Sequence, residues 1–303
     1  MMRKLIVFIV LGFLCYNLKA QEFISIWPEG KMPNSKGMVL QDSISNERIF
    51  QVGKPGFYAF FPSLQEHKRA AVLIYPGGGY QRLAYNISGF QLAKWFNTMG
   101  ISAFVLNYRL PISPDLLQPE NGPIADAQRA IKIIRQYAKE WDLDVQKIGV
   151  IGSSAGGHLA ALQSTLIEDF SIINDAIDST NYLPNFTILV SPVIDMGTYA
   201  HKGSKENLLG KNPSLKTINK FSPHLNVNSK TPICFIADAF NDQSVNPQNS
   251  LLYYQALLTH KIPTSFHVFP QGGHAIALRN NPGSTQQWTN LCEAWLIESN
   301  IIK

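Results

Sequence analysis

A short apolar strand that runs into a G-x-S-x-G turn is the feature that most restricts how this chain can fold. Residues 148–151 favour a strand, the turn is centred on Ser154, and small residues typical of a closely packed helix follow from Ala155. This order of strand, tight turn and helix lifts a serine hydroxyl clear of the sheet. Gly152 and Gly156 flank the turn because side chains there would collide with the neighbouring strand and helix. The pattern predicts the nucleophile elbow of a serine hydrolase, with an ordinary strand-to-helix turn as the alternative.

Apolar strands and amphipathic helices alternate along most of the chain. Residues 70–75 are continuously apolar, which is typical of a strand buried on both faces. The longest amphipathic pattern predicts a helix over 123–141. The alternation predicts an α/β fold, with a mostly parallel, doubly wound sheet and helices on both faces. Further strands are expected at 57–61, 101–106, 148–151, 186–190, 233–237 and 266–269, and further helices at 88–99, 155–166, 247–260 and 286–299.

The chain carries no internal repeat or low-complexity tract, and we expect residues 21–303 to form one domain. A polar stretch at 195–230 lies between two predicted strands and is too short to be a second domain. Loops at the carboxyl end of such a sheet commonly surround its ligand site. We therefore expect this stretch to shape a substrate site.

A serine nucleophile needs a base that takes its proton and a carboxylate that holds the base in the correct tautomer. In α/β-hydrolases these residues follow the chain order Ser, Asp or Glu, His. Asp242 follows one late predicted strand, and His274 lies in a glycine-rich loop directly after the last one. The sequence therefore predicts Ser154, Asp242 and His274 as a catalytic triad, with Asp238 and, more weakly, Asp195 as alternatives for the acid.

The other histidines are expected outside the triad. His158 belongs to the helix that leaves the elbow, and we expect it to pack or to form hydrogen bonds there. The remaining five are expected on the surface, in loops or in strands: His67, His201, His224, His260 and His267.

Three consecutive glycines at 77–79 follow the buried strand at 70–75. They cost conformational entropy that a plain turn would not require. An oxyanion hole needs backbone N–H groups directed at the developing negative charge. We expect the N–H groups of Gly78, Gly79 and Ala155 to form it, with a flexible loop as the alternative.

The first twenty residues, 1–20, have the pattern of a secretory signal. Arg3 and Lys4 precede an apolar run at 5–16, and the segment ends on the small residue Ala20. The run is too short to span a bilayer comfortably. We expect a cleaved signal, a secreted or periplasmic mature protein and no membrane insertion, with an uncleaved anchor as the alternative.

Net charge and cysteine content bear on which partners, disulfides and metals we expect. Cleavage would remove Arg3, Lys4 and Lys19 and no acid, which lowers the net charge from +5 to +2 and does not suggest a nucleic-acid partner. Cys234 and Cys292 remain, as two buried free thiols or as one disulfide. The cysteine spacing does not indicate a metal site, and we expect no metal or cofactor.

Five motifs occur together in this chain, at 26–30 (IWPEG), 76–80 (PGGGY), 106–110 (LNYRL), 126–130 (DAQRA) and 152–160 (GSSAGGHLA). In these motifs the chain resembles secreted bacterial carbohydrate esterases of the α/β-hydrolase superfamily, the acetylxylan and feruloyl esterases related to hormone-sensitive-lipase-like enzymes. The resemblance extends from about Trp27 to the C-terminal helix. It implies hydrolysis of O-acetyl or feruloyl esters on plant polysaccharides such as xylan.

The chain departs from that family in two places. Ser88-Gly89 stands where relatives often carry Glu-Gly, and Asn246 stands where a proline is common. These departures bear on the substrate more than on the chemistry. Two residues in the shared motifs, Arg109 and Asp126, are expected to form a structural ion pair.

Two other functions compete with a carbohydrate esterase. A general short-chain carboxylesterase or lipase has the same catalytic residues, although no long apolar lid is visible in the sequence. A non-catalytic binding protein of the same fold usually loses the serine or the histidine, and both are present here. The oligomeric state stays open. Four tyrosines near the predicted site are candidates for stacking on sugar rings or for the core: Tyr80, Tyr85, Tyr108 and Tyr199.

Overall fold

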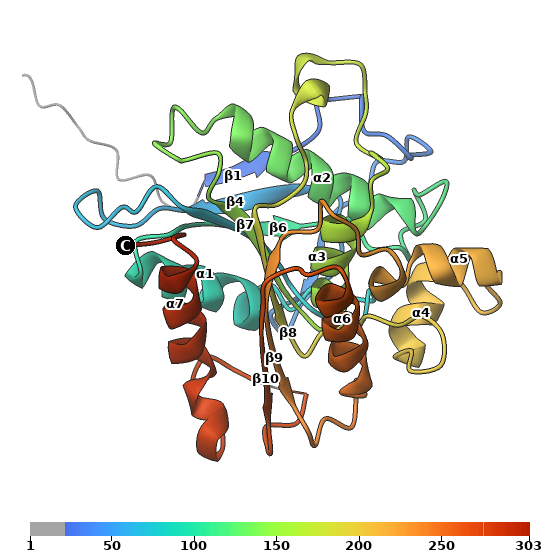
Figure 1. Ribbon diagram of the computed structural model, residues 1–303. Coiled ribbons are helices and arrows are strands. Elements are labelled where there is room, and N and C mark those ends of the chain that lie inside the picture. Colours follow the sequence, from blue (N-terminus) through green and yellow to red (C-terminus); the bar gives the residue numbers. More distant parts are fainter. Residues whose placement is uncertain (1–21, 275) are drawn as a thin grey trace, which may run out of the picture.

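The computed structural model describes residues 22–274 and 276–303, so the predicted signal at 1–20 and Gln21 lie outside the described residues. A central sheet contains eight strands: β1 (Glu22–Ser25), β4 (Gly56–Phe60), β5 (Ala71–Tyr75), β6 (Ser102–Asn107), β7 (Ile148–Ser153), β8 (Phe186–Val190), β9 (Ile233–Ala239) and β10 (Thr264–Phe269). Their order is β1-β4-β6-β5-β7-β8-β9-β10 (Figure 1). Neighbours are parallel from β6 to β10, whereas β1 and β4 form an antiparallel edge. The mostly parallel sheet predicted from the sequence is confirmed.

Helices cover both faces of the sheet, as a doubly wound fold requires (Figure 1). One face packs against α2 (Asn121–Gln136), α3 (Ala155–Thr165) and α6 (Gln248–Thr259), and the other against α1 (Gln91–Thr98) and α7 (Trp288–Glu298). Side chains of β5 alternate between the two cores. Leu73 and Tyr75 lie in the first core, while Val72 and Ile74 lie in the second. A strand buried on both faces therefore reads as the continuous apolar run seen in the sequence.

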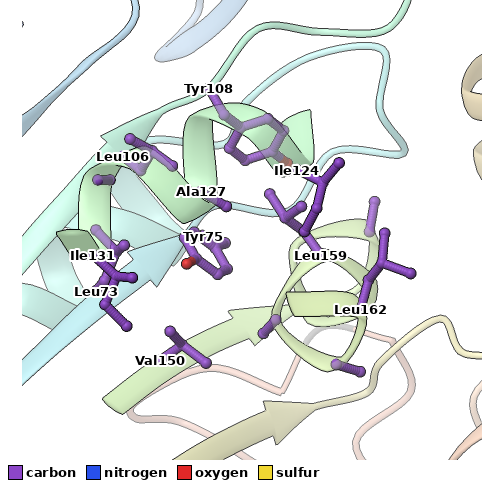
Figure 2. Packing of buried hydrophobic residues seen from close by; sticks show 14 of the residues in the cluster. Leu73, Tyr75, Leu106, Tyr108, Ile124, Ala127, Ile131, Val150, Leu159 and Leu162 are labelled. Carbon is purple, nitrogen blue, oxygen red and sulfur yellow. The ribbon is translucent and has the colours of Figure 1, made fainter. Parts of the chain in front are cut away.

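Figure 2 shows the core between the sheet and helices α2 and α3. Ile124, Ala127 and Ile131 project from α2 toward Tyr75, and Leu159 faces them from α3 (Figure 2). Burial of each large apolar side chain stabilises the fold by roughly 1.5–3 kcal/mol. This packing fixes α3, and with it the turn that precedes α3, against the sheet.

Two predicted helices differ from the observed ones. The helix expected at 123–141 ends at Gln136, because the chain turns at Tyr137 and reaches a left-handed residue at Asp142, where φ is 50°. The helix expected at 88–99 is divided into a π-helical turn over Asn86–Phe90 and the regular helix α1. Periodicity alone does not reveal such changes in helical winding.

The polar stretch at 195–230 folds into two short helices, α4 (Lys202–Leu209) and α5 (Leu215–Lys220), which lie together at one end of the molecule (Figure 1). A separate hairpin of β2 (Ser43–Ser45) and β3 (Arg48–Gln51) precedes β4. Within the described residues, every helix falls short of the length or apolar character that crossing a membrane requires.

Candidate active site

The predicted elbow forms between β7 and α3. Ser154 adopts φ 55° and ψ −125°, a conformation that is rare for a residue with a side chain and is typical of strained functional turns. The flanking glycines are required by space. A Cβ on Gly152 would lie 2.1 Å from the carbonyl oxygen of Gly156, and one on Gly156 would lie 2.0 Å from that of Tyr75. Close packing of strand, turn and helix therefore places the Ser154 hydroxyl above the end of the sheet.

The structure brings the three predicted triad residues together. The Ser154 Oγ lies 2.9 Å from Nε2 of His274, and Nδ1 of the same histidine lies 2.7 Å from Oδ2 of Asp242. These residues follow β7, β9 and β10, whose carboxyl ends meet at one edge of the sheet. The result is a continuous chain of hydrogen bonds from a hydroxyl to a buried carboxylate.

Asp242 is fitted to hold the imidazole in one tautomer. Its side chain is closed to solvent, and Oδ1 accepts hydrogen bonds from the N–H groups of Ser244 and Val245. Burial acts to raise the pKa of this carboxyl, but hydrogen bonds from His274, Val245 and Ser244 outweigh it, so the pKa lies below its ordinary value. The carboxylate therefore accepts the Nδ1 proton of His274, which leaves Nε2 free to accept the proton of Ser154.

The alternative acids lie elsewhere. Asp238 accepts hydrogen bonds from Ser250 at 2.5 Å and from the N–H of Ala239 at 2.7 Å. Burial raises the pKa of Asp238 to about 6. Asp195 accepts from the N–H groups of Gly197 and Tyr199, both at 2.7 Å. Asp238 is thus bonded to α6 and to its own strand, whereas Asp195 is bonded to its own loop. Neither forms a hydrogen bond with a described histidine.

The glycine loop lies directly against the elbow. A Cβ on Gly77 would approach the Cβ of Ser154 to 3.3 Å, so that glycine permits the contact. Gly78 and Gly79 have φ values of 142° and 66°, which favour glycine. Among the described residues, the N–H groups of Gly78 and Gly79 have no hydrogen-bond partner. Ala155 is the first residue of α3, so its N–H has no acceptor within that helix.

Two contacts fix this loop. The Ser88 hydroxyl accepts from the N–H of Gly77 at 3.1 Å and donates to the carbonyl of Ala84 at 3.0 Å. Tyr80, which follows the glycines, donates its hydroxyl to Nδ1 of His158 at 2.7 Å. The loop is thereby held from two sides.

His158 is a buried structural residue, in agreement with the sequence prediction. Its Nε2 donates to the carbonyl of Phe221 at 2.8 Å, so Nδ1 is the acceptor for Tyr80. Burial lowers the pKa of His158 to about 4, although the bond to Phe221 acts in the opposite direction. His158 therefore joins the glycine loop to the insertion at 195–230 as a neutral side chain.

A cavity of about 480 Å³ opens over Ser154 and His274. The lining of the cavity contains both apolar and polar side chains. The apolar ones belong to Ile87, Leu92, Ile151, Ile276, Leu278 and Trp288, and the polar ones to Arg48, Gln81, Arg82, His201 and Asn207. This mixed lining is compatible with an ester whose acyl group is apolar and whose alcohol is polar.

Two of the polar lining residues, His201 and Asn207, come from the insertion. The N–H of Ser204 donates to Nδ1 of His201 at 3.2 Å, which assigns the proton of the neutral ring to Nε2. Burial and then the nearby His274 lower the pKa of His201, so the ring stays neutral. Asn207 donates to the carbonyl of Gly79 at 2.8 Å. The insertion thus presents an N–H donor to the cavity and also supports the glycine loop.

The insertion at 195–230 was expected to shape a substrate site, and it contributes His201 and Asn207 to the cavity over Ser154. The sequence did not single out either residue within that stretch, since His201 was expected on the surface, in a loop or in a strand, and their placement depends on how the insertion packs. The close approach of Gly77 to the nucleophile was not anticipated either, although the glycine run was an available signal for it.

The four candidate tyrosines separate into two groups. Tyr80 and Tyr108 are buried, with the Tyr108 hydroxyl donating to the carbonyl of Pro76 at 2.7 Å, so stacking on a substrate is wrong for these two. Tyr85 packs against the core, and Tyr199 is exposed.

The expected ion pair is present and buried. Arg109 donates to both carboxylate oxygens of Asp126, with the shortest side-chain contact at 2.8 Å, and Trp27 donates its indole N–H to the same carboxylate at 2.7 Å. This network joins the first motif of the chain to the middle ones. Cys234 and Cys292 are both buried and unpaired, and burial raises the pKa of each thiol.

The profile of the BD-FAE family matches residues 59–257, more than half of the chain. The chain belongs to the BD-FAE family. This places it among α/β-hydrolase esterases, in agreement with the resemblance seen in the sequence.

Two curated relatives support the BD-FAE assignment. An endo-1,4-beta-xylanase B of Butyrivibrio fibrisolvens is 34% identical over 244 residues, which cover 78% of this chain and 38% of the relative. An acetylxylan esterase of Xylanibacter ruminicola is 33% identical over 229 residues, which cover 73% and 44%. The chain spans less than half the length of these two relatives.

Solved structures support the fold over almost the whole chain. The acetyl ester-xyloside bifunctional hydrolase of Caldicellulosiruptor lactoaceticus superposes with a TM-score of 0.79 at 33% identity, covering 93% of this chain and 98% of the other. Carboxylesterase Cest-2923 of Lactobacillus plantarum has the same fold, with a TM-score of 0.69 at 23% identity over 87% and 99% of the two chains. The α/β-hydrolase fold predicted from the sequence is confirmed.

Proposed function

We propose that this protein is a serine esterase that removes O-acetyl groups from a plant polysaccharide such as xylan. The observation that carries the proposal is the hydrogen-bonded chain from Ser154 through His274 to Asp242, which faces a cavity lined by both polar and apolar side chains. The acetylxylan esterase and the acetyl ester-xyloside hydrolase among its relatives support the choice of substrate.

Acylation begins with attack of the Ser154 Oγ on the ester carbonyl carbon. Nε2 of His274 takes the hydroxyl proton as the C–O bond forms, and Asp242 stabilises the resulting imidazolium. The carbonyl oxygen becomes an oxyanion that accepts hydrogen bonds from the N–H groups of Gly78, Gly79 and Ala155. Collapse of this intermediate breaks the bond to the sugar oxygen, which takes the proton from His274 and leaves as an alcohol.

Deacylation repeats these steps with water as the nucleophile. Nε2 of His274 takes a proton from water, the hydroxide attacks the acyl carbon, and a second oxyanion forms in the same hole. Its collapse restores the Ser154 hydroxyl, to which His274 returns the proton, and releases the carboxylic acid. Every proton in the two half-reactions passes through one imidazole, so the mechanism needs no metal or cofactor.

The polar and apolar side chains of the cavity orient the ester. The acyl group packs on the apolar side chains, and the hydroxyls of the sugar bond to the polar ones, among them the Nε2–H of His201. The apolar side chains include Leu92, Leu278 and Trp288, which supports a longer or aromatic acyl group as a second candidate. A feruloyl ester fits that second candidate.

We further propose that the signal at 1–20 is cleaved and that the enzyme acts in the periplasm or outside the cell, where polysaccharide fragments are met. N-terminal sequencing of protein recovered from outside the cytoplasm tests this, with Gln21 as the expected first residue. A first residue of Met1 on the exported protein would contradict cleavage.

The activity is tested by acetate release from acetylated xylan, with Ser154→Ala as the control and p-nitrophenyl acetate as a sugar-free ester. Release that disappears in the variant would support both the serine mechanism and the polysaccharide substrate. Cleavage of p-nitrophenyl acetate without release from xylan would retain the mechanism and reject xylan. Inactivity on both esters would contradict the proposed enzyme.

A further inference from the structure

A second cleft, of about 640 Å³, lies beside the catalytic acid. It is formed by the loop between β8 and α4 and by the loop between β9 and α6, and Asp242 lies in its wall. Ser244 lines both this cleft and the catalytic cavity. Ser244 therefore lies between the two cavities, which makes the second cleft the neighbouring surface for a ligand chain bound over Ser154.

Two exposed aromatic rings line this cleft. The exposed fraction of Phe240 is 74% and that of Tyr199 is 39%, so neither ring serves as a core residue. Both backbones are anchored. The N–H of Phe240 donates to the carbonyl of Phe269 at 2.7 Å, and the N–H of Tyr199 donates to Asp195 at 2.7 Å. Two rings presented on fixed backbones lose little conformational entropy when a ligand covers them.

The remaining lining of the cleft combines amide or hydroxyl side chains with apolar ones. The polar side chains belong to Thr198, Gln243, Ser244, Asn246 and Gln248, and the apolar ones to Ala200, Pro247, Leu251, Phe266 and Val268. Among the described lining residues, Asp242 alone carries a charge, and its side chain is closed to solvent and bonded to His274. The cleft therefore favours a neutral ligand with many hydroxyl groups over a charged polymer.

We propose that this cleft binds the sugar rings that neighbour the esterified sugar in the polysaccharide chain. Sugar rings have apolar C–H faces, which pack on aromatic rings, and hydroxyl edges, which bond to amides. Phe240 and Tyr199 supply the first kind of contact, and the glutamine and asparagine side chains supply the second. This inference rests on the proposed polysaccharide substrate and adds a subsite for its backbone.

The test compares esters of increasing length: p-nitrophenyl acetate, acetylated xylobiose, acetylated xylohexaose and acetylated xylan. For the wild type we expect kcat/KM to rise with the number of sugars. In Phe240→Ala, the ratio of kcat/KM for xylohexaose to that for p-nitrophenyl acetate should fall about tenfold, mainly through a higher KM, which corresponds to about 1.4 kcal/mol. Phe240→Tyr, which keeps a ring, should restore most of the ratio.

Leu64→Ala is the matched control, because Leu64 is 93% exposed and lines neither cavity. Its ratio should equal that of the wild type. The subsite is wrong if Phe240→Ala leaves the ratio unchanged while the wild type still releases acetate from xylan. It is also wrong if light scattering shows a dimer that Phe240→Ala dissociates with no change in the ratio, because Phe240 then serves self-association. If the wild type releases no acetate from any sugar ester, the proposed function itself fails.

Discussion

Asp126 and Asp242 both have side chains closed to solvent and several hydrogen-bond donors, yet they are bonded to different partners. Asp126 is paired with Arg109, a cation whose charge does not change, and the indole of Trp27 adds a further donor. Asp242 is paired with His274, an imidazole whose other ring nitrogen contacts the hydroxyl of Ser154.

The two pairs also differ in their exposure to solvent. Arg109 and Asp126 are enclosed, whereas the side chain of His274 is 27% exposed and contacts the hydroxyl of a residue held at positive φ. A buried carboxylate paired with a permanent cation, as in Asp126, stabilises the fold. A buried carboxylate paired with an imidazole that lines a cavity, as in Asp242, can support proton transfer to a ligand there. Burial and hydrogen bonding therefore do not by themselves identify a catalytic acid.

The largest expected effect is a loss of activity when Asp242, but not Asp126, is substituted. Asp242→Asn should lower kcat on p-nitrophenyl acetate by about 10⁴-fold, because the amide stabilises the wrong imidazole tautomer, with Ser154→Ala at least as severe. The melting temperature should change little. A loss smaller than tenfold in Asp242→Asn would assign the role of the acid to another residue.

The next largest effect is a loss of stability when Asp126 is substituted. Asp126→Asn should lower the free energy of unfolding by about 3–5 kcal/mol, because the charge of Arg109 is left buried without its partner. Urea unfolding measures this loss, and kcat per folded molecule should stay within about twofold of the wild type, since Asp126 does not touch the cavity. The exposed pair of Arg69 and Asp142 is the matched control, and Asp142→Asn should cost less than about 1 kcal/mol.

A buried histidine with no carboxylate partner sharpens the contrast with His274. The pKa of His158 is about 4 in the fold and about 6.5 when unfolded, so the unfolded chain binds more protons between these values. Stability should therefore fall as the pH is lowered from 6.5 to 4, with His158 accounting for roughly 3 kcal/mol. Urea unfolding of wild type and His158→Gln across this range measures the difference, and equal slopes for the two proteins would contradict it.

The smallest effect concerns Asp238, the acid that does not reach a histidine. Its pKa of about 6 exceeds the ordinary value, so the stability that its protonated form provides is lost as the pH rises from about 4 through 6. Asp238→Asn should remove this loss, so that above pH 7 the free energy of unfolding of the variant exceeds that of the wild type by up to about 3 kcal/mol. Thermal unfolding at pH 4.5 and pH 8 checks the sign. A drop in kcat as large as that of Asp242→Asn would contradict the assignment of the acid.

The positions of the proposed catalytic residues were predictable from the sequence because each follows one of the strands that the alternating pattern indicates. Once the parallel order of strands is recognised, the loops after β7, β9 and β10 must meet at one edge of the sheet, so Ser154, Asp242 and His274 converge there. The glycine run predicted the loop beside them for a similar reason, since only a special backbone conformation needs three glycines in succession.

The substrate-binding surface was not predictable in the same way. Its residues, among them His201 and Phe240, lie in loops and in the insertion, where no periodic pattern relates sequence to position. His201 faces the cavity because α4 packs against the glycine loop, and the exposure of Phe240 depends on where β9 ends. Both facts depend on tertiary contacts that a local pattern does not contain.

The hydrogen bond from Asn207 to the carbonyl of Gly79 has a consequence for anyone who builds chimeras of this enzyme. Exchange of residues 195–230 for the corresponding stretch of a relative, made to alter substrate range, would also remove a support of the glycine loop beside Ser154. The segment of the relative that corresponds to 76–80 should therefore be transferred together with the insertion. In this architecture a change in substrate range is expected to change the catalytic rate as well.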